Sequence, residues 1–233
     1  DDYIFIDIHD HETSENWIIP AADPAAQPKL VAIRETGIEY ELVSGGDVFF
    51  ILTNDGNAKD FKICQAPVEA PGKENWTDIV PHRPGTLILS HGAFKGHLVW
   101  MERHEGLPRI TIRDRETGEE HAIAFDEEAY ALGLGGALEY DSDWIRFTYS
   151  SMTTPSQLFD YNMRTRERIL LKTQEVPSGH VIEDYVTRRV FAAAPDGEKV
   201  PVSLLYRKNT RLDGSAPCLL YGYGAYGISI PAS

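Results

Sequence analysis

The sequence predicts a mainly β protein, with a partial β-propeller followed by the first strands of a second domain. Two observations support the propeller. Strand-like segments recur at a period in the forties, and each repeat alternates short strands with polar turns. A third observation supports the second domain: after Lys172 the repeat stops, and a hairpin pattern leads to an apolar run that ends in "YGYGAYG".

Composition limits the partners and the compartment. The chain carries 36 acidic and 22 basic residues, a formal net charge of -14, which argues against nucleic acid or an anionic membrane as a partner. A cationic peptide would suit this charge, but an acidic surface kept for solubility is the favoured explanation. Cys64 and Cys218 match no metal spacing and are expected to be thiols. With no leader pattern and no bilayer-spanning apolar run, we expect a soluble, cytoplasmic protein.

Residues 1–36 are expected to form the last three strands of a blade whose first strand is missing. "DYIFIDIH" and "SENWIIP" flank a polar turn, and "KLVAIRE" closes the unit. A propeller closes a ring of about four to eight blades, and an open stack leaves sheet edges bare. We therefore expect the sequence to be a piece of a longer protein.

The next three units are expected to be complete four-stranded blades. Aromatic anchors mark the same strand in each repeat and lie 45, 50 and 47 residues apart. They are Phe5, Phe50, Trp100 and Phe147. The predicted blades are 37–84, 85–128 and 129–174, with inner strands near Tyr40, Ile88 and Leu132.

Beyond the blades, the polar connector "TQEVPSGHVIEDY" leads to a predicted hairpin at about 185–208 and a predicted strand at 218–223. A hairpin followed by an apolar strand with a Gly-rich end is how the sheet of an α/β-hydrolase begins, and the turn after its third strand supplies oxyanion-hole donors. We expect a propeller domain over 1–174 and the start of an α/β-hydrolase domain over 175–233.

The stretch from "LKTQEVPSGH" through "VFAAAPDGEKVPVSLLYRK" to "LLYGYGAYGIS" resembles the propeller-to-hydrolase junction of the prolyl oligopeptidase family of serine peptidases. The "YGYGAYG" form and "DHETSENW" in the first unit are similar to the oligopeptidase B branch. The resemblance covers essentially the whole chain and is sharp over about 170–230. It implies that 1–174 is a propeller lid and that 175–233 begins a peptidase domain, truncated before its catalytic Ser. It also implies that the Ser-Asp-His triad lies C-terminal to the motif on which this sequence ends.

No nucleophile is expected within the sequence itself. Gly-x-Ser-x-Gly does not occur, and Ser178-Gly179-His180 lacks both the first Gly and a preceding strand, so it is expected to be a connector turn. The chain alone is therefore expected to be inactive.

Tyr223 is the candidate catalytic residue. From spacing alone it could be an aromatic packed in a turn, but the resemblance implies that its hydroxyl helps hold the oxyanion, and Gly222 and Gly224 would let the backbone turn tightly beside the substrate. Tyr226 is a candidate substrate-binding residue, with plain packing as the alternative.

No metal or other cofactor is expected. "HDHE" at His9–Glu12 could suggest a metal, but His9 and His11 have no second ligand cluster at a usable spacing, so a solvated turn is favoured. The remaining histidines are scattered through turns and strands and suggest no catalysis.

Two functions follow from different features. The resemblance implies a serine oligopeptidase that cleaves short peptides after Arg or Lys, with the propeller restricting substrate size. The repeat alone would favour a non-enzymatic propeller scaffold. A scaffold, however, needs no strand ending in "YGYGAYG", and Trp-Asp repeat signatures are missing.

One departure from the family concerns specificity. The best-known bacterial members place two acidic residues, spaced i and i+2, just beyond the motif, where they help hold a second basic residue of the substrate. The matching positions here are Pro231 and Ser233, which carry no charge. A second basic residue is therefore expected to add little.

Overall fold

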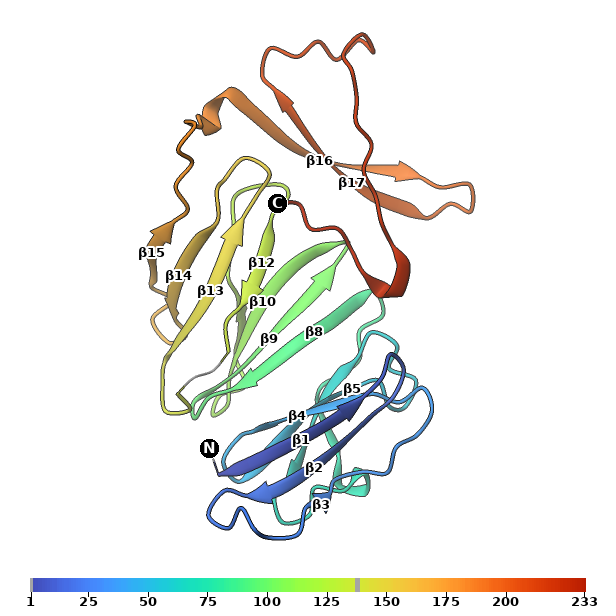
Figure 1. Cartoon of the computed structure of the whole chain (residues 1–233), viewed down its shortest axis with the longest axis vertical. Coiled ribbons are helices and arrows are strands. Elements are labelled where there is room, and N and C mark those ends of the chain that lie inside the picture. The colour runs from blue at the N-terminus through green and yellow to red at the C-terminus, as the bar shows by residue number, and fades with distance from the viewer. Residues whose placement is uncertain (1, 137–138) are drawn as a thin grey trace. The chain divides into compact units, whose positions relative to one another are not determined.

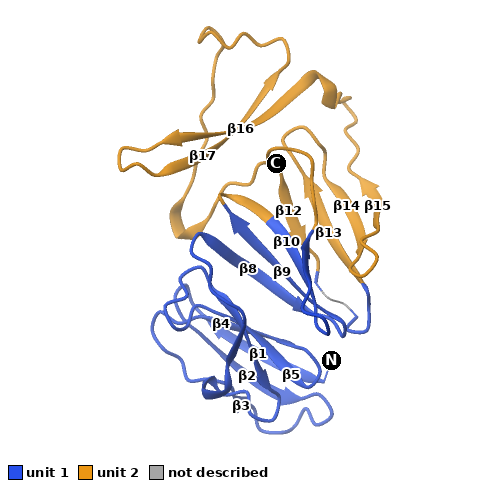
Figure 2. Cartoon of the chain, turned by 180° about the vertical axis from the view of Figure 1, so that it is seen from behind, with its two compact units in different colours: residues 1–104, 109–122, 136–143 blue, residues 105–108, 123–135, 144–233 orange. Residues whose placement is uncertain are grey.

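The computed structural model describes residues 2–136 and 139–233, which consist almost entirely of strands and turns (Figure 1). The chain divides into two compact units (Figure 2). The first comprises Asp1–His104, Arg109–Ala122 and Gly136–Asp143, and the second comprises Glu105–Pro108, Ile123–Gly135 and Trp144–Ser233. No helix in the described part of the chain is long and apolar enough to cross a membrane.

The first sheet has three antiparallel strands in the order β1-β2-β3, namely Tyr3–His9, Ser14–Pro20 and Lys29–Leu30. Phe5 lies opposite Ile18 in the register of β1 and β2. This sheet confirms that residues 1–36 form a three-stranded blade fragment.

Three four-stranded antiparallel sheets follow, each with its strands in sequence order (Figure 1). They confirm the predicted blades and their inner strands near Tyr40, Ile88 and Leu132. The first contains β4 (Tyr40–Ser44), β5 (Val48–Thr53), β6 (Lys62–Pro67) and β7 (Thr77–Val80). The second contains β8 (Thr86–Ala93), β9 (His97–His104), β10 (Leu107–Asp114) and β11 (Glu120–Ala122). The third contains β12 (Ala131–Leu134), β13 (Trp144–Ser150), β14 (Gln157–Asn162) and β15 (Arg168–Thr173).

The alternation of side chains along β5 explains how the sheets of the first unit stack. Successive residues of a strand point to opposite faces. Phe49 and Ile51 join a buried cluster with residues of the first sheet, including Ile18. Phe50 and Leu52 join a second cluster, which reaches β8 and β9. The continuous apolar run "VFFIL" is therefore a strand that is buried on both faces.

In the second unit, an aromatic cluster forms the core of the third blade. Phe147 stacks on Phe159 with 5.2 Å between ring centroids, and Phe125 stacks on Tyr149 at 4.9 Å. The anchors Phe50, Trp100 and Phe147 occupy the second strand of their blades and are buried. The 45- to 50-residue period thus marks equivalent positions in successive sheets.

The hairpin expected at 185–208 is confirmed by β16 (Tyr185–Ala193) and β17 (Lys199–Arg207), which pair along their whole length. The strand expected at 218–223 is wrong for this structure, because these residues form no strand. A strand is held by hydrogen bonds to a neighbour, and no strand among residues 2–136 and 139–233 pairs with this run. Its Leu219 and Leu220 are 92% and 86% exposed.

Candidate functional site

The Gly- and Tyr-rich motif lies in the extended segment after β17. Its ordered feature is a short 3-10 turn at Ala225–Gly227, closed by a hydrogen bond of 3.1 Å from the amide of Ile228 to the carbonyl of Ala225. Tyr223 precedes this turn and is 52% exposed. Tyr223 is therefore not packed in a core.

Tyr226 lies inside this turn in the left-handed region, with φ 55° and ψ 35°, and is 83% exposed. A non-glycine residue in this region carries a modest conformational cost. Tyr226 therefore lies exposed in a turn, three residues after Tyr223 in the sequence.

Gly222 and Gly224 lie in open space, since a Cβ added at either position meets no atom within 4 Å. Neither requires glycine through a left-handed φ or a close approach in this structure. The expected role of both glycines beside a substrate stays a prediction.

The phenol of Tyr223 can donate a hydrogen bond to a developing negative charge.

The Ser178-Gly179-His180 segment lies in a turn in which the Gly179 amide donates to the Val176 carbonyl at 2.9 Å. Its Gly179 has a left-handed φ of 82°, a conformation typical of a turn.

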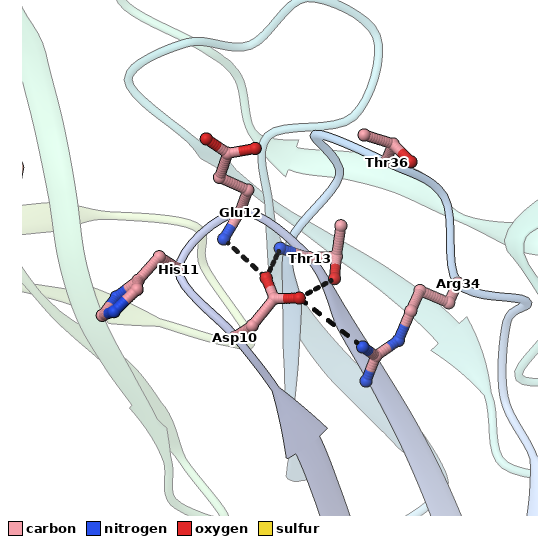
Figure 3. Close-up of a pocket in the computed structure, with 6 residues that line it drawn as sticks. All are labelled: Asp10, His11, Glu12, Thr13, Arg34 and Thr36. Carbon is pink, nitrogen blue, oxygen red and sulfur yellow. Dashed lines mark hydrogen bonds and ion pairs between the residues drawn. The ribbon is translucent and has the colours of Figure 1, made fainter.

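The "HDHE" segment borders a shallow pocket of about 590 Å³ in the first unit (Figure 3). The Asp10 carboxylate accepts hydrogen bonds from the amides of Glu12 (2.8 Å) and Thr13 (2.9 Å), and these bonds hold its pKa below the ordinary value. The Arg34 guanidinium lies 3.7 Å from it. The two amide bonds show that Asp10 caps its own turn. The His11 ring points away from this carboxylate (Figure 3).

The sequence interpretation missed a polar cluster around Glu127 in the second unit. The carboxylate accepts hydrogen bonds from the hydroxyls of Tyr149 (2.8 Å), Thr153 (3.2 Å) and Thr154 (2.5 Å). Burial acts to raise the pKa of Glu127, but the hydroxyls of this cluster, Ser151 included, outweigh burial and lower it. Burial and the bond to Glu127 raise the pKa of Tyr149.

His180 extends this cluster to the connector. Its Nε2 lies 2.5 Å from the carbonyl oxygen of Thr153, and its ring lies 5.5 Å from that of Tyr185, centroid to centroid. The dense hydroxyls of "SSMTTP" were the available sequence signal, but their carboxylate and imidazole partners lie more than twenty residues away on either side.

Two other buried ionisable groups have structural partners. Glu102 accepts a hydrogen bond from the indole of Trp100 at 2.8 Å and pairs with Arg83 and Arg109. His91 Nε2 lies 3.1 Å from the carbonyl oxygen of Phe50, and burial lowers the pKa of His91 to about 4. These two groups therefore hold strands together.

Comparison with known proteins agrees with this architecture. The family model for the prolyl oligopeptidase N-terminal β-propeller domain matches residues 1–174. Dipeptidyl aminopeptidase BI of Pseudoxanthomonas mexicana is 39% identical over 231 residues, covering 99% of this chain and 32% of that protein.

Among solved structures, oligopeptidase B from Trypanosoma brucei with covalently bound antipain, in its closed form, superposes with a TM-score of 0.90 at 30% identity. Oligopeptidase B from Leishmania major gives a TM-score of 0.90 at 29% identity. Each match covers 99% of this chain and 34% of the other chain. The chain thus spans about a third of the length of these relatives.

Proposed function

This chain belongs to the prolyl oligopeptidase family, and from that premise we propose that it is part of a serine oligopeptidase that hydrolyses short peptides. In this proposal it comprises the later blades of the propeller lid and the start of the peptidase domain. The single observation that carries the proposal is the order of its parts: blades, then a connector and hairpin, then the exposed "YGYGAYG" motif.

The proposed mechanism is acyl transfer. A Ser from the rest of the protein attacks the peptide carbonyl, a His transfers the proton, and an Asp orients the His. The Tyr223 hydroxyl and a backbone amide donate hydrogen bonds to the oxyanion of the tetrahedral intermediate. The half-exposed position of Tyr223 supports this role, because the residue is not packed in a core.

The proposed substrates are short peptides cleaved after Arg or Lys, in keeping with the similarity to oligopeptidase B. Pro231 and Ser233 carry no charge, so a second basic residue upstream lacks the carboxylates that would bind it there. A charge-assisted hydrogen bond is worth roughly 1.5–3 kcal/mol, or about ten- to a hundredfold in kcat/KM. The proposal is therefore cleavage after a single basic residue.

A second candidate activity is removal of dipeptides from a free amino terminus. It is favoured by the 39% identity to a protein named dipeptidyl aminopeptidase BI. Both candidates share the proposed serine chemistry and differ in whether the substrate must begin two residues before the cleaved bond.

Matched fluorogenic substrates test these proposals on the full-length protein. Blocked Gly-Arg and Arg-Arg substrates should be cleaved with kcat/KM values within about tenfold of each other. A preference for Arg-Arg of about a hundredfold would show that other acidic groups bind the second basic residue. Cleavage of free Gly-Arg with no cleavage of its blocked counterpart would select the dipeptidyl activity instead.

A fluorophosphonate probe tests the serine chemistry separately. The full-length protein should be labelled on one serine outside this chain, and the 233-residue chain alone should not be labelled. Stoichiometric labelling of a serine within this chain would contradict the proposed location of the nucleophile.

A further inference from the structure

The connector at 174–184 joins the third blade to the β16–β17 hairpin, and all of its residues are exposed. At its start, the amide of Gln174 donates to the carbonyl of Ser156 at 2.7 Å. Further along, His180 reaches the carbonyl of Thr153. An exposed segment has little buried surface to hold it, so individual hydrogen bonds decide its position.

His180 is the donor in its bond to Thr153. A carbonyl oxygen can only accept, so Nε2 must carry a proton, which both the Nε2-H tautomer and the charged ring provide. The ring also lies against Tyr185 at the start of β16, and the Arg207 guanidinium lies 5.7 Å from the centre of the Tyr185 ring. His180 therefore links the blade to the base of the hairpin.

The acceptor is itself held in place by the Glu127 cluster. Thr153 and Thr154 donate their hydroxyls to the Glu127 carboxylate, and both of their amides donate to the hydroxyl of Ser151, at 3.1 and 2.8 Å. These bonds fix the turn on both sides of the Thr153 carbonyl. Such a network has more rigidity than a single hydrogen bond would give.

We propose that Glu127, Thr153 and His180 form a connector latch that sets the position at which the peptidase part leaves the third blade. The first half of this inference concerns the connector alone. The second half rests on the proposed function: release of the latch lets the connector move, and this relaxes the limit that the propeller sets on substrate length. Glu127 and His180 are positioning residues in this scheme.

Hydrogen exchange on the full-length protein tests the first half. The amides of Gly179 and Asp184 form turn hydrogen bonds within the connector, so a peptide over 175–184 reports its opening. His180→Phe keeps an aromatic ring beside Tyr185 and removes the donor, and it should speed exchange in this peptide by about fivefold, while a peptide over β13 stays unchanged. His9→Phe, on the exposed β1, is the matched control. Unchanged exchange in the His180 variant overturns the latch.

The Glu127→Gln variant tests the indirect step. It should speed exchange over 175–184 as His180→Phe does, and the double variant should add little more, because both changes break one chain of contacts. Additive effects would show that Glu127 and His180 act independently and would overturn their joint role.

Peptide hydrolysis tests the second half. The ratio of kcat/KM for a peptide several times longer to kcat/KM for a short peptide should be severalfold higher in His180→Phe than in the unmodified protein. The kcat for the short peptide should stay unchanged. Faster exchange with an unchanged length preference would overturn the link to substrate length. Faster exchange in a full-length protein without peptidase activity would sustain the latch and overturn the proposed function.

Discussion

Trp100 and Tyr223 are both aromatic residues that the sequence marks out, yet their surroundings differ completely. Trp100 is fully buried in β9, and its indole donates to Glu102. Tyr223 is half-exposed in an extended segment that forms no strand. The blades find their packing partners within the chain, whereas the run at 218–223 forms no strand and leaves Leu219 and Leu220 largely in solvent.

The contrast separates residues that make the fold from residues that are available for function. Removing a large apolar side chain from water contributes about 1.5–3 kcal/mol, and this applies to Trp100 and to the β5 residues. Leu219 and Leu220 lie largely in solvent, and exposed apolar residues grouped in this way indicate a surface that binds something else. In the proposed peptidase, the next strands of the hydrolase sheet would cover that surface.

The largest expected effect on stability is that of Trp100→Ala. It should lower the free energy of unfolding of the chain by about 3–5 kcal/mol, because it leaves a cavity and removes a donor from the buried Glu102. Urea denaturation measures the change. Trp144→Ala, at a partly exposed position of β13, is the control and should cost less than about 1 kcal/mol. Equal losses would contradict the assignment of Trp100 as a blade anchor.

The second expected effect is a pH dependence that arises from His91. In the folded chain burial lowers its pKa to about 4, and its Nδ1 is buried with no hydrogen-bond partner among residues 2–136 and 139–233. The unfolded chain binds a proton near pH 6.5, so this contribution to stability is complete above that pH and is lost as the pH falls toward 4. The loss should be on the order of 2 kcal/mol.

Urea denaturation between pH 7 and about 4.5 would measure this loss. His91→Asn removes the titrating ring, so the stability of this variant should change less with pH over this window. His9→Asn, at an exposed position of β1, should retain the pH dependence of the unmodified chain. A His91→Asn variant with the full dependence would assign the titration to other groups.

A smaller effect distinguishes two glycines. Gly118 has φ 74° in the turn between β10 and β11, where its amide donates to the carbonyl of Asp114. Gly118→Ala should cost about 1 kcal/mol because alanine is strained at this φ. Gly222→Ala, at a position open to solvent, should change the stability of the chain by less than about 0.5 kcal/mol. A cost at Gly222 equal to that at Gly118 would show that the motif is already packed.

The sequence was sufficient to predict the blades because each blade repeats one local pattern. The period of the anchors and the alternation of apolar residues depend only on nearby residues, and the sheets follow that pattern. The prediction of a strand at 218–223 was wrong because a strand needs a neighbouring strand to pair with. The local sequence pattern does not show whether such a neighbour is present. Glu127, Thr153 and His180 were missed as a group because their contacts join distant positions with no shared motif.

The smallest expected effect on stability accompanies the most direct test of the functional account. Tyr223→Phe removes only a hydroxyl from a half-exposed side chain, so it should leave the free energy of unfolding within about 0.5 kcal/mol of its original value. In the full-length protein the same change should lower kcat at least about tenfold, with little change in KM, because the lost hydrogen bond forms in the transition state. An unchanged kcat in a stably folded Tyr223→Phe enzyme would contradict the role of Tyr223 as an oxyanion donor.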